Sequence, residues 1–218
     1  EFFARLAGDL SKAPTRIANL RDKLQSLTNA GVDRVIVEHF NAVTRHKIGG
    51  KAKAMVVTSS RAAAIRYKKA FDRYIEQHSE YGFIHSLVAF SGKMTGKQVM
   101  HQDDSEFKDD VFIVDENEEF TEQSMNPDVQ GQDLRFAFDR PEYRVMLVAD
   151  KFQTGYDEPL LHTMYVDKQL SGIKAVQTLS RLNRKAPGKD EVARAANTSA
   201  GRLSRSKLVV SCPFGQWR

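Results

Sequence analysis

Short, almost wholly apolar runs recur along the chain and are separated by stretches of mixed polarity. The run at 54–58 reads AMVVT, and the runs at 86–90, 143–149 and 161–167 are similar in length and character. Runs of this kind are typical of strands that are buried on both faces, as in a parallel sheet with helices on either side. We therefore predict four strands and an α/β fold whose sheet is mostly parallel.

Helical spacing fills the intervals between these runs. After Ser59 and Ser60, which can cap a helix, aromatic residues recur at helical spacing to about Gln77. A second helix is predicted for 172–184, because a Pro-Gly pair follows shortly afterwards as a stop signal. Both helices connect predicted strands or follow the last of them, as expected for an α/β unit.

The remaining segments differ in composition from this central part, 51–191. Apolar stripes at helical spacing predict a helical arm in 1–50, with helices at 15–28 and 32–43. An acidic segment at about 101–122 holds ten acidic residues and one lysine, which indicates a loop or insertion, with a helix possible in 120–136. Residues 192–218 form a basic tail that is either foreign to the natural gene or natural and poorly ordered.

The net charge of +5 does not by itself indicate a nucleic-acid partner. Five of the 33 Lys and Arg residues lie in 192–218, which has no acidic residue, so 1–191 carries 28 basic and 28 acidic residues. The single cysteine, Cys212, excludes an internal disulfide framework and fits a reducing compartment. No transmembrane helix and no secretory signal are recognisable, so we expect a cytoplasmic protein without a membrane partner. The histidines lack ligand spacing, so no metal site is expected.

Four polar segments are expected at one edge of the predicted sheet. In parallel sheets ligands bind where the carboxyl ends of the strands meet. The polar residues that follow the predicted strands should gather there. They lie at 58–60, 91–92, 150–157 and 167–168.

The segment KFQTGYDEP, residues 151–159, directly follows the third predicted strand. Thr154 and Gly155 offer a hydroxyl and a tight turn with backbone N–H groups, which suit a phosphate or a nearby backbone. Asp157 could accept a hydrogen bond from a ribose hydroxyl. A simple turn between two strands would explain the same residues, so this segment alone leaves both interpretations open.

The segment QTLSRLNR, residues 177–184, places Arg181 and Arg184 about one helical turn apart, on a face shared with Gln177. Two guanidinium groups on one face can stabilise the charge of a phosphoryl group during its transfer. The alternative is a solvated face, or arginines that pair with the acidic segment.

Taken together and in this order, these segments resemble the second RecA-like lobe of superfamily 2 helicases and translocases. The resemblance is closer still to the motor (R) subunit of type I restriction endonucleases. It spans 51–191 and is looser across the acidic insertion. The segments that carry it are KAMVVTSSRAAAIRYKKAFDRYI, LVAFSG, EYRVMLVADKFQTGYDEPLLHTMYVDKQLSG and IKAVQTLSRLNRKAPGKDE.

The resemblance implies roles for the residues that match the motifs of these motors. Thr58, Ser59 and Ser60 match a motif that grips the DNA backbone. Ser91 and Gly92 match a second turn that contacts the backbone.

The other two motifs concern the nucleotide. Thr154 matches a DNA contact in the loop that joins DNA binding to nucleotide sensing. Gly155 and Asp157 match its nucleotide-binding positions, with Asp157 near the ribose. In the final motif, Arg184 would be the arginine finger on the γ-phosphate and Arg181 its phosphate-sensing companion. The residues that match this final motif are Gln177, Arg181 and Arg184.

The resemblance also implies cofactors and partners in a bacterial or archaeal cytoplasm. ATP and Mg²⁺ would be held mainly by a first RecA-like lobe, and the partners would be that lobe, double-stranded DNA, and the methylation and specificity subunits. No G-x-x-x-x-G-K-[ST] phosphate loop occurs in the sequence, so we expect a motor fragment that is inactive alone. The alternatives are another superfamily 2 translocase lobe, from a type III restriction or repair motor, or a non-catalytic α/β interaction module.

Overall fold

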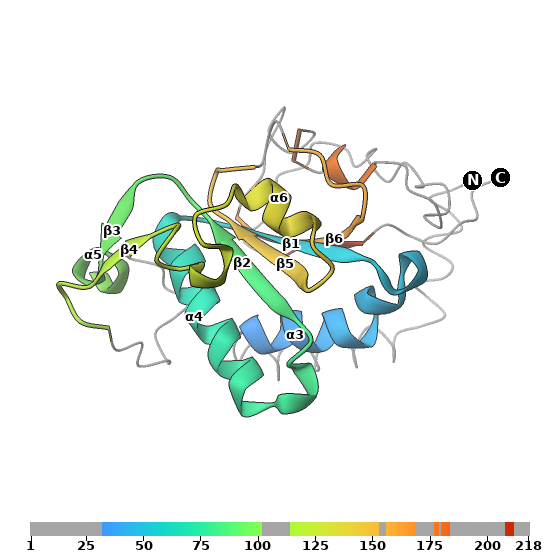
Figure 1. The fold of residues 1–218 in the computed structure, drawn as a ribbon, viewed down its shortest axis with the longest axis horizontal. Coiled ribbons are helices and arrows are strands. Elements are labelled where there is room, and N and C mark those ends of the chain that lie inside the picture. The colour runs from blue at the N-terminus through green and yellow to red at the C-terminus, as the bar shows by residue number, and fades with distance from the viewer. Residues whose placement is uncertain are drawn as a thin grey trace, which may run out of the picture.

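A five-stranded sheet forms the centre of the molecule (Figure 1). The computed structural model describes residues 32–101, 114–152, 156–168, 177–178, 180–183 and 208–211. The strand order is β2-β5-β1-β6-β7, with the first four strands parallel and β7 antiparallel to β6. This confirms the predicted α/β fold with a mostly parallel sheet. The strands are β1 Lys53–Thr58, β2 His85–Ala89, β5 Tyr143–Val148, β6 Leu161–Asp167 and β7 Leu208–Ser211.

Helices cover both faces of the sheet. Helices α3 and α4 lie on one face, and α6 lies on the other (Figure 1). The described α-helices are α3 Val32–Ala42, α4 Arg61–Gln77, α5 Gly96–His101 and α6 Leu134–Asp139. Short 3-10 turns are described at η1 Thr44–His46, η2 Ile48–Gly50, η3 Ser79–Tyr81, η5 Pro127–Val129 and η6 Ser180–Asn183.

Alternate residues of the central strand divide the core into two clusters. Ala54 and Val56 of β1 pack with α3 and α4, whereas Met55 and Val57 pack with α6. Successive side chains of a strand point to opposite faces, so an uninterrupted apolar run is required here. The structure therefore confirms both the strand predicted at 54–58 and the reason for it, which is burial of the strand on both faces.

At the β2 edge of the sheet, the side chain of Asn126 pairs with one residue of the strand. Asn126 accepts a hydrogen bond from the backbone N–H of Val88 in β2 at 2.9 Å and donates to the carbonyl oxygen of the same residue at 2.8 Å. The amide thus imitates a neighbouring strand at a buried position. Unpaired backbone N–H and C=O groups at a sheet edge can pair with other chains. Asn126 satisfies both of these groups at one residue, Val88.

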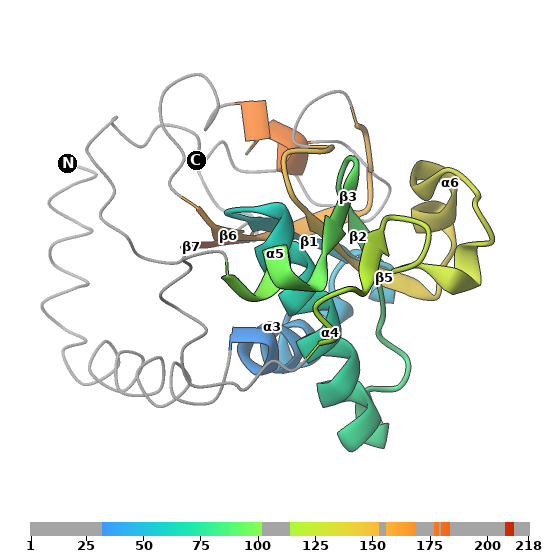
Figure 2. The same cartoon turned by 90° about the vertical axis from the view of Figure 1, so that its left-hand side faces the viewer.

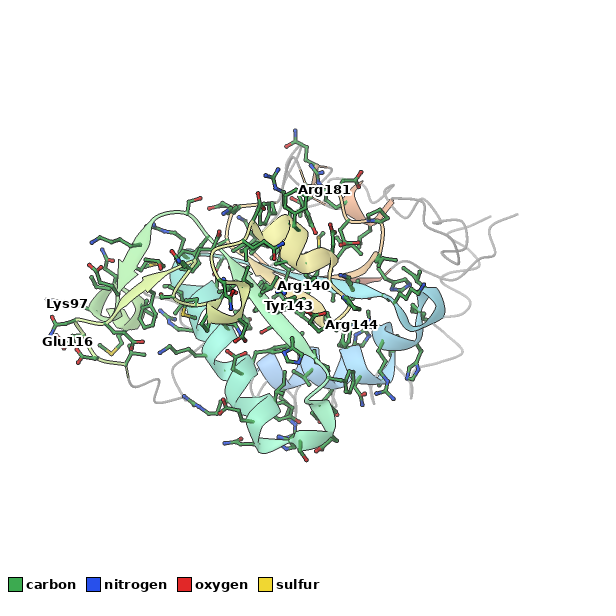
Figure 3. The ribbon with its side chains drawn as sticks, in the orientation of Figure 1. Lys97, Glu116, Arg140, Tyr143, Arg144 and Arg181 are labelled. Atoms are coloured by element: carbon green, nitrogen blue, oxygen red, sulfur yellow. The ribbon has the colours of Figure 1, made fainter. Side chains whose placement is uncertain are left out.

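A small two-stranded sheet projects from the body and was not predicted (Figure 1); Figure 2 shows the molecule from the side on which it lies. It joins β3 Lys93–Thr95 to β4 Glu119–Thr121, the latter within the predicted acidic insertion. At its end, the backbone N–H of Lys97 donates to the carbonyl oxygen of Glu116 at 3.0 Å, and both residues are labelled in Figure 3. Gly96 is required beside them, because a Cβ there would lie 1.9 Å from the carbonyl oxygen of Asp115.

Several predicted segments fall partly or wholly outside the described residues. The helix predicted at 15–28 lies outside them, whereas the one at 32–43 is confirmed by α3. Of the helix predicted for 172–184, residues 177–178 are helical and η6 follows as a tighter 3-10 turn. Strand β7 lies in the predicted tail, where it pairs with β6.

Candidate functional site

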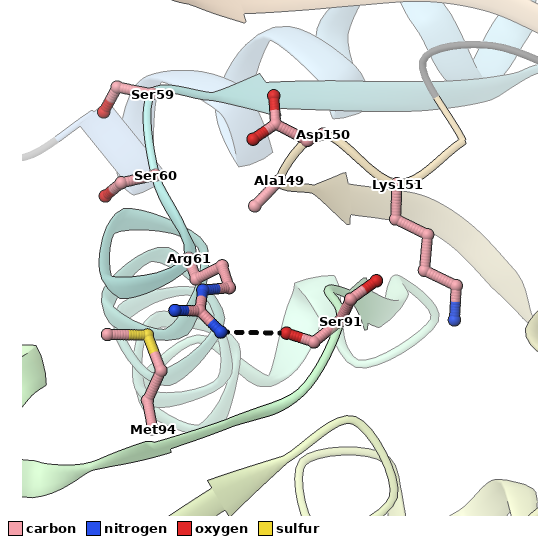
Figure 4. Close-up of a pocket in the computed structure, with 8 residues that line it drawn as sticks. All are labelled: Ser59, Ser60, Arg61, Ser91, Met94, Ala149, Asp150 and Lys151. Atoms are coloured by element: carbon pink, nitrogen blue, oxygen red, sulfur yellow. Dashed lines mark hydrogen bonds between the residues drawn. The ribbon is translucent and has the colours of Figure 1, made fainter.

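Three strands of the central sheet end at a pocket with a volume of about 570 Å³ (Figure 4). The residues that follow β1, β2 and β5 surround it, as expected for the carboxyl edge of a parallel sheet. The structure brings residues of three of the four predicted segments together there, and the fourth joins through an ion pair described below. Of the predicted segment 150–157, only Asp150 and Lys151 line the pocket. The prediction was wrong for Asp157, whose neighbour Glu158 pairs with Lys53 at the start of β1. The lining residues are Ser59, Ser60, Arg61, Ser91, Met94, Ala149, Asp150 and Lys151.

The motif that follows β1 divides into a buried and an exposed part. Thr58 is fully buried, and its hydroxyl lies 3.0 Å from the carbonyl oxygens of both Ser60 and Val148. Ser60 is the N-cap of α4 and accepts a hydrogen bond from the backbone N–H of Ala63 at 3.1 Å. Ser59 between them is exposed at the pocket. Thr58 therefore fixes the turn, and Ser59 presents its side chain to the pocket.

Arg61, which the sequence did not single out, connects the first two segments. Its guanidinium donates to the carbonyl oxygen of Ser91 at 3.0 Å (Figure 4). Gly92 follows with a φ of +78°, and a Cβ there would lie 3.2 Å from the Arg61 Nη1 atom. Glycine at 92 thus permits both the backbone conformation and the close approach of Arg61. The only signal in the sequence is a basic residue just inside a helix start.

The third segment is held at the pocket by two ion pairs. Asp150 has a φ of +59°, which turns the chain sharply after β5, and its carboxylate lies 2.8 Å from the Lys168 ammonium group beyond β6. Lys151 donates to both carboxylate oxygens of Glu122 at 2.7 Å. Glu122 also accepts from the backbone N–H of Phe90 at 3.1 Å. These contacts join the ends of β2, β5 and β6.

The two segments with the nucleotide motifs meet away from this pocket. Arg181 of η6 donates from its Nη1 atom to the carbonyl oxygen of Tyr156, the residue before Asp157. Figure 3 shows Arg181 on the side of the sheet that α6 covers. Asp157 and Gln177 are exposed. Three predicted site residues lie outside the described residues: Thr154, Gly155 and Arg184.

No cluster of metal ligands is found in the described part of the chain. There, no three residues of the types His, Cys, Asp and Glu lie close enough to hold an ion. His162 is buried, with its Nδ1 atom 3.1 Å from the Thr163 hydroxyl. Within the same residues, no helix combines the length and the apolar character that a membrane span needs.

Comparison with known proteins gives one family. The family model for domain 3 of the type I restriction enzyme subunit R matches residues 50–193. The putative type I restriction enzyme MjaVIIP endonuclease subunit of Methanocaldococcus jannaschii is 27% identical over 183 residues, which are 84% of this chain. The HindI endonuclease subunit of Haemophilus influenzae is 27% identical over 189 residues, also 84% of this chain.

These relatives are much longer than the chain. The match covers 16% of the length of each of these two proteins. The putative MjaIXP endonuclease subunit of M. jannaschii is 28% identical over 70% of this chain, and the match covers 12% of that protein. The family model covers more than half of the chain, including all four parallel strands and the pocket. The chain belongs to the type I restriction enzyme subunit R family, in the region of domain 3.

Proposed function

We propose that this chain is the second RecA-like lobe of an ATP-dependent DNA translocase within a type I restriction endonuclease subunit. The observation that carries the proposal is the contact between Arg181 and the carbonyl oxygen of Tyr156. It joins the two segments that a motor needs side by side, the loop with Asp157 and the segment that ends in Arg184.

The pocket at the carboxyl edge is the proposed DNA grip. Ser59 and Ser91 lie at its rim, and Arg61 and Lys151 add positive charge. Hydroxyl groups, backbone N–H groups and basic side chains are the usual partners of phosphate oxygens. Such contacts carry no sequence information, so we propose that double-stranded DNA is held here by its backbone and that another subunit recognises the sequence.

The segment around Arg181 is the proposed nucleotide side of the lobe. Arg181 is half-buried, and its guanidinium group donates to the carbonyl oxygen of Tyr156 beside Asp157. Arg181 and Arg184 would stabilise negative charge, and Asp157 would accept from the ribose. ATP with Mg²⁺ supplies the phosphoryl transfer that drives translocation. The phosphate loop would come from a first lobe, so we propose that this chain alone does not hydrolyse ATP.

Loss of the Arg61 charge should weaken DNA binding by the full-length subunit in a salt-dependent way. If Arg61 neutralises one phosphate, Arg61→Gln should reduce the slope of log K against log salt concentration by about one. The measurement is DNA affinity at several salt concentrations, with duplexes of different sequence. The loss should be the same for each duplex, because backbone contacts do not distinguish bases.

The matched control is Arg73→Gln, an exposed arginine on the same helix α4 that does not line the pocket. The slope should stay unchanged in that variant. Equal slopes for Arg61→Gln and the unmodified subunit would contradict the placement of DNA at this pocket.

A further inference from the structure

A buried ion pair lies where strand β1 begins, at the end of the strand opposite to the pocket. Lys53, the first residue of β1, is 1% exposed, and Glu158 is 4% exposed. Their charged atoms, Lys53 Nζ and Glu158 Oε2, are 4.0 Å apart. Burial of two charges is costly unless both are well hydrogen-bonded, so the other partners of each group matter.

Both groups have such partners. The Lys53 ammonium group donates to the carbonyl oxygen of Phe138 and, at 3.1 Å, to that of Arg140, just after α6. It also lies over the Phe138 ring, 4.7 Å from the centroid. The Glu158 carboxylate accepts from the backbone N–H of Leu160 at 2.8 Å. Lysine at 53 therefore connects the start of β1, the end of α6 and the segment that leads into β6.

Glu158 belongs to a segment with alternating exposure. Tyr156 and Glu158 are each 4% exposed, whereas Asp157 between them is exposed. The Tyr156 hydroxyl lies 3.4 Å from Glu158 Oε2, and the Tyr156 carbonyl oxygen accepts from Arg181. Two inward side chains thus fix the segment on either side of Asp157.

Burial acts against both charges of the pair. Burial lowers the pKa of Lys53 and raises the pKa of Glu158, while the attraction between the two opposes both shifts. Burial and the neighbouring Glu158 also raise the pKa of the Tyr156 hydroxyl, which stays protonated and able to donate. The three groups therefore depend on one another for their charge and hydrogen bonds.

We propose that Lys53 and Glu158 are positioning residues for nucleotide binding. They hold the 156–158 segment from either side, through the buried Tyr156 and Glu158, so that Asp157 between them faces outward. The inference rests on the proposed function, because it assigns the pair a role through Asp157. It differs from a purely structural role, since the effect of the pair should pass through that one side chain.

A double-mutant cycle on the full-length subunit tests this. Asp157→Ala should raise the KM for ATP about tenfold or more, and Lys53→Met should raise it by a similar factor. Because Lys53 acts through Asp157, adding Lys53→Met to Asp157→Ala should raise KM no further. The control Lys68→Met removes another lysine paired with a carboxylate, at 2.7 Å from Asp72 in α4, and should leave KM unchanged.

The possible outcomes separate this inference from the proposed function. If Asp157→Ala raises KM but Lys53→Met does not, or if the two effects multiply in the double variant, the positioning role is wrong and the nucleotide site stands. If Asp157→Ala itself leaves KM unchanged, the nucleotide role of Asp157 is wrong and the inference fails with it. Should Lys53→Met not fold, the cycle is run with Glu158→Gln, which keeps the shape and removes the charge.

Discussion

Replacement of Arg184 by alanine in the full-length subunit should lower ATP turnover by about a thousandfold or more. An arginine finger stabilises the charge that develops on the transferred phosphoryl group, and its loss costs orders of magnitude in rate. The proposed assignment comes from the resemblance of the final segment to a motor motif, in which Arg181 would be the companion arginine. Because Arg181 also contacts the carbonyl oxygen of Tyr156, Arg181→Ala should impair ATP binding as well as turnover.

The measurement is steady-state ATP hydrolysis with saturating DNA. Arg184→Lys is a second variant that tests whether charge alone is sufficient. Lysine keeps the charge but lacks the planar guanidinium group that contacts two phosphate oxygens. It should remain strongly impaired. Arg73→Gln on α4 controls for the loss of an exposed arginine and should hydrolyse ATP normally. Near-normal turnover in Arg184→Ala would show that Arg184 is not an arginine finger.

Lys53→Met should lower the free energy of unfolding of the chain by about 3 kcal/mol. Removal of one partner leaves the Glu158 charge buried without compensation, and such losses are typically about 3–5 kcal/mol. Methionine has a similar volume, so a cavity contributes little. In a chain of this size the loss corresponds to a fall in Tm of roughly 10 °C. Urea denaturation or calorimetry measures it directly.

Two comparisons identify the cause of that loss. In the Lys68–Asp72 pair the lysine side chain is 11% exposed and the aspartate side chain 43% exposed. Lys68→Met therefore leaves a carboxylate that water can hydrate, and the cost should be about 1 kcal/mol. Lys53→Met combined with Glu158→Leu removes both charges and should recover most of the stability, because a buried pair can often be replaced by apolar side chains. If Lys53→Met were no more harmful than Lys68→Met, the pair would not be buried in solution as it is in the structure.

Much of the fold follows from the sequence because each central strand is buried on both faces. Met55 and Val56 pack against opposite helical layers, so residues 54–57 are all apolar. The same argument explains β2, β5 and β6. Strands β3 and β4 have three residues each, and β3 alternates in exposure over so short a span that no period is detectable. Their pairing depends on how the intervening chain brings β4 alongside β3, and no local pattern predicts that.

The residues that complete the site were harder to predict. Lys53 begins an apolar strand, where a lysine would ordinarily be assigned to solvent, and its burial depends on Glu158 much later in the chain. Arg61 indicates only a helix start until β2 brings the Ser91 carbonyl oxygen within 3.0 Å. The gathering of Ser59, Ser91 and Asp150 was predictable, because it follows from parallel strands ending at one edge.

The most direct test of the central claim is nucleotide binding in a mixture of this chain with the first RecA-like lobe of the same subunit. An ATP analogue should bind the mixture more tightly than either part alone, and the gain should disappear when the chain carries Arg184→Ala. Such a result is predicted if this lobe supplies one wall of a shared ATP site. The same affinity with and without the chain, or a gain that survives Arg184→Ala, would contradict the account and favour a non-catalytic interaction module.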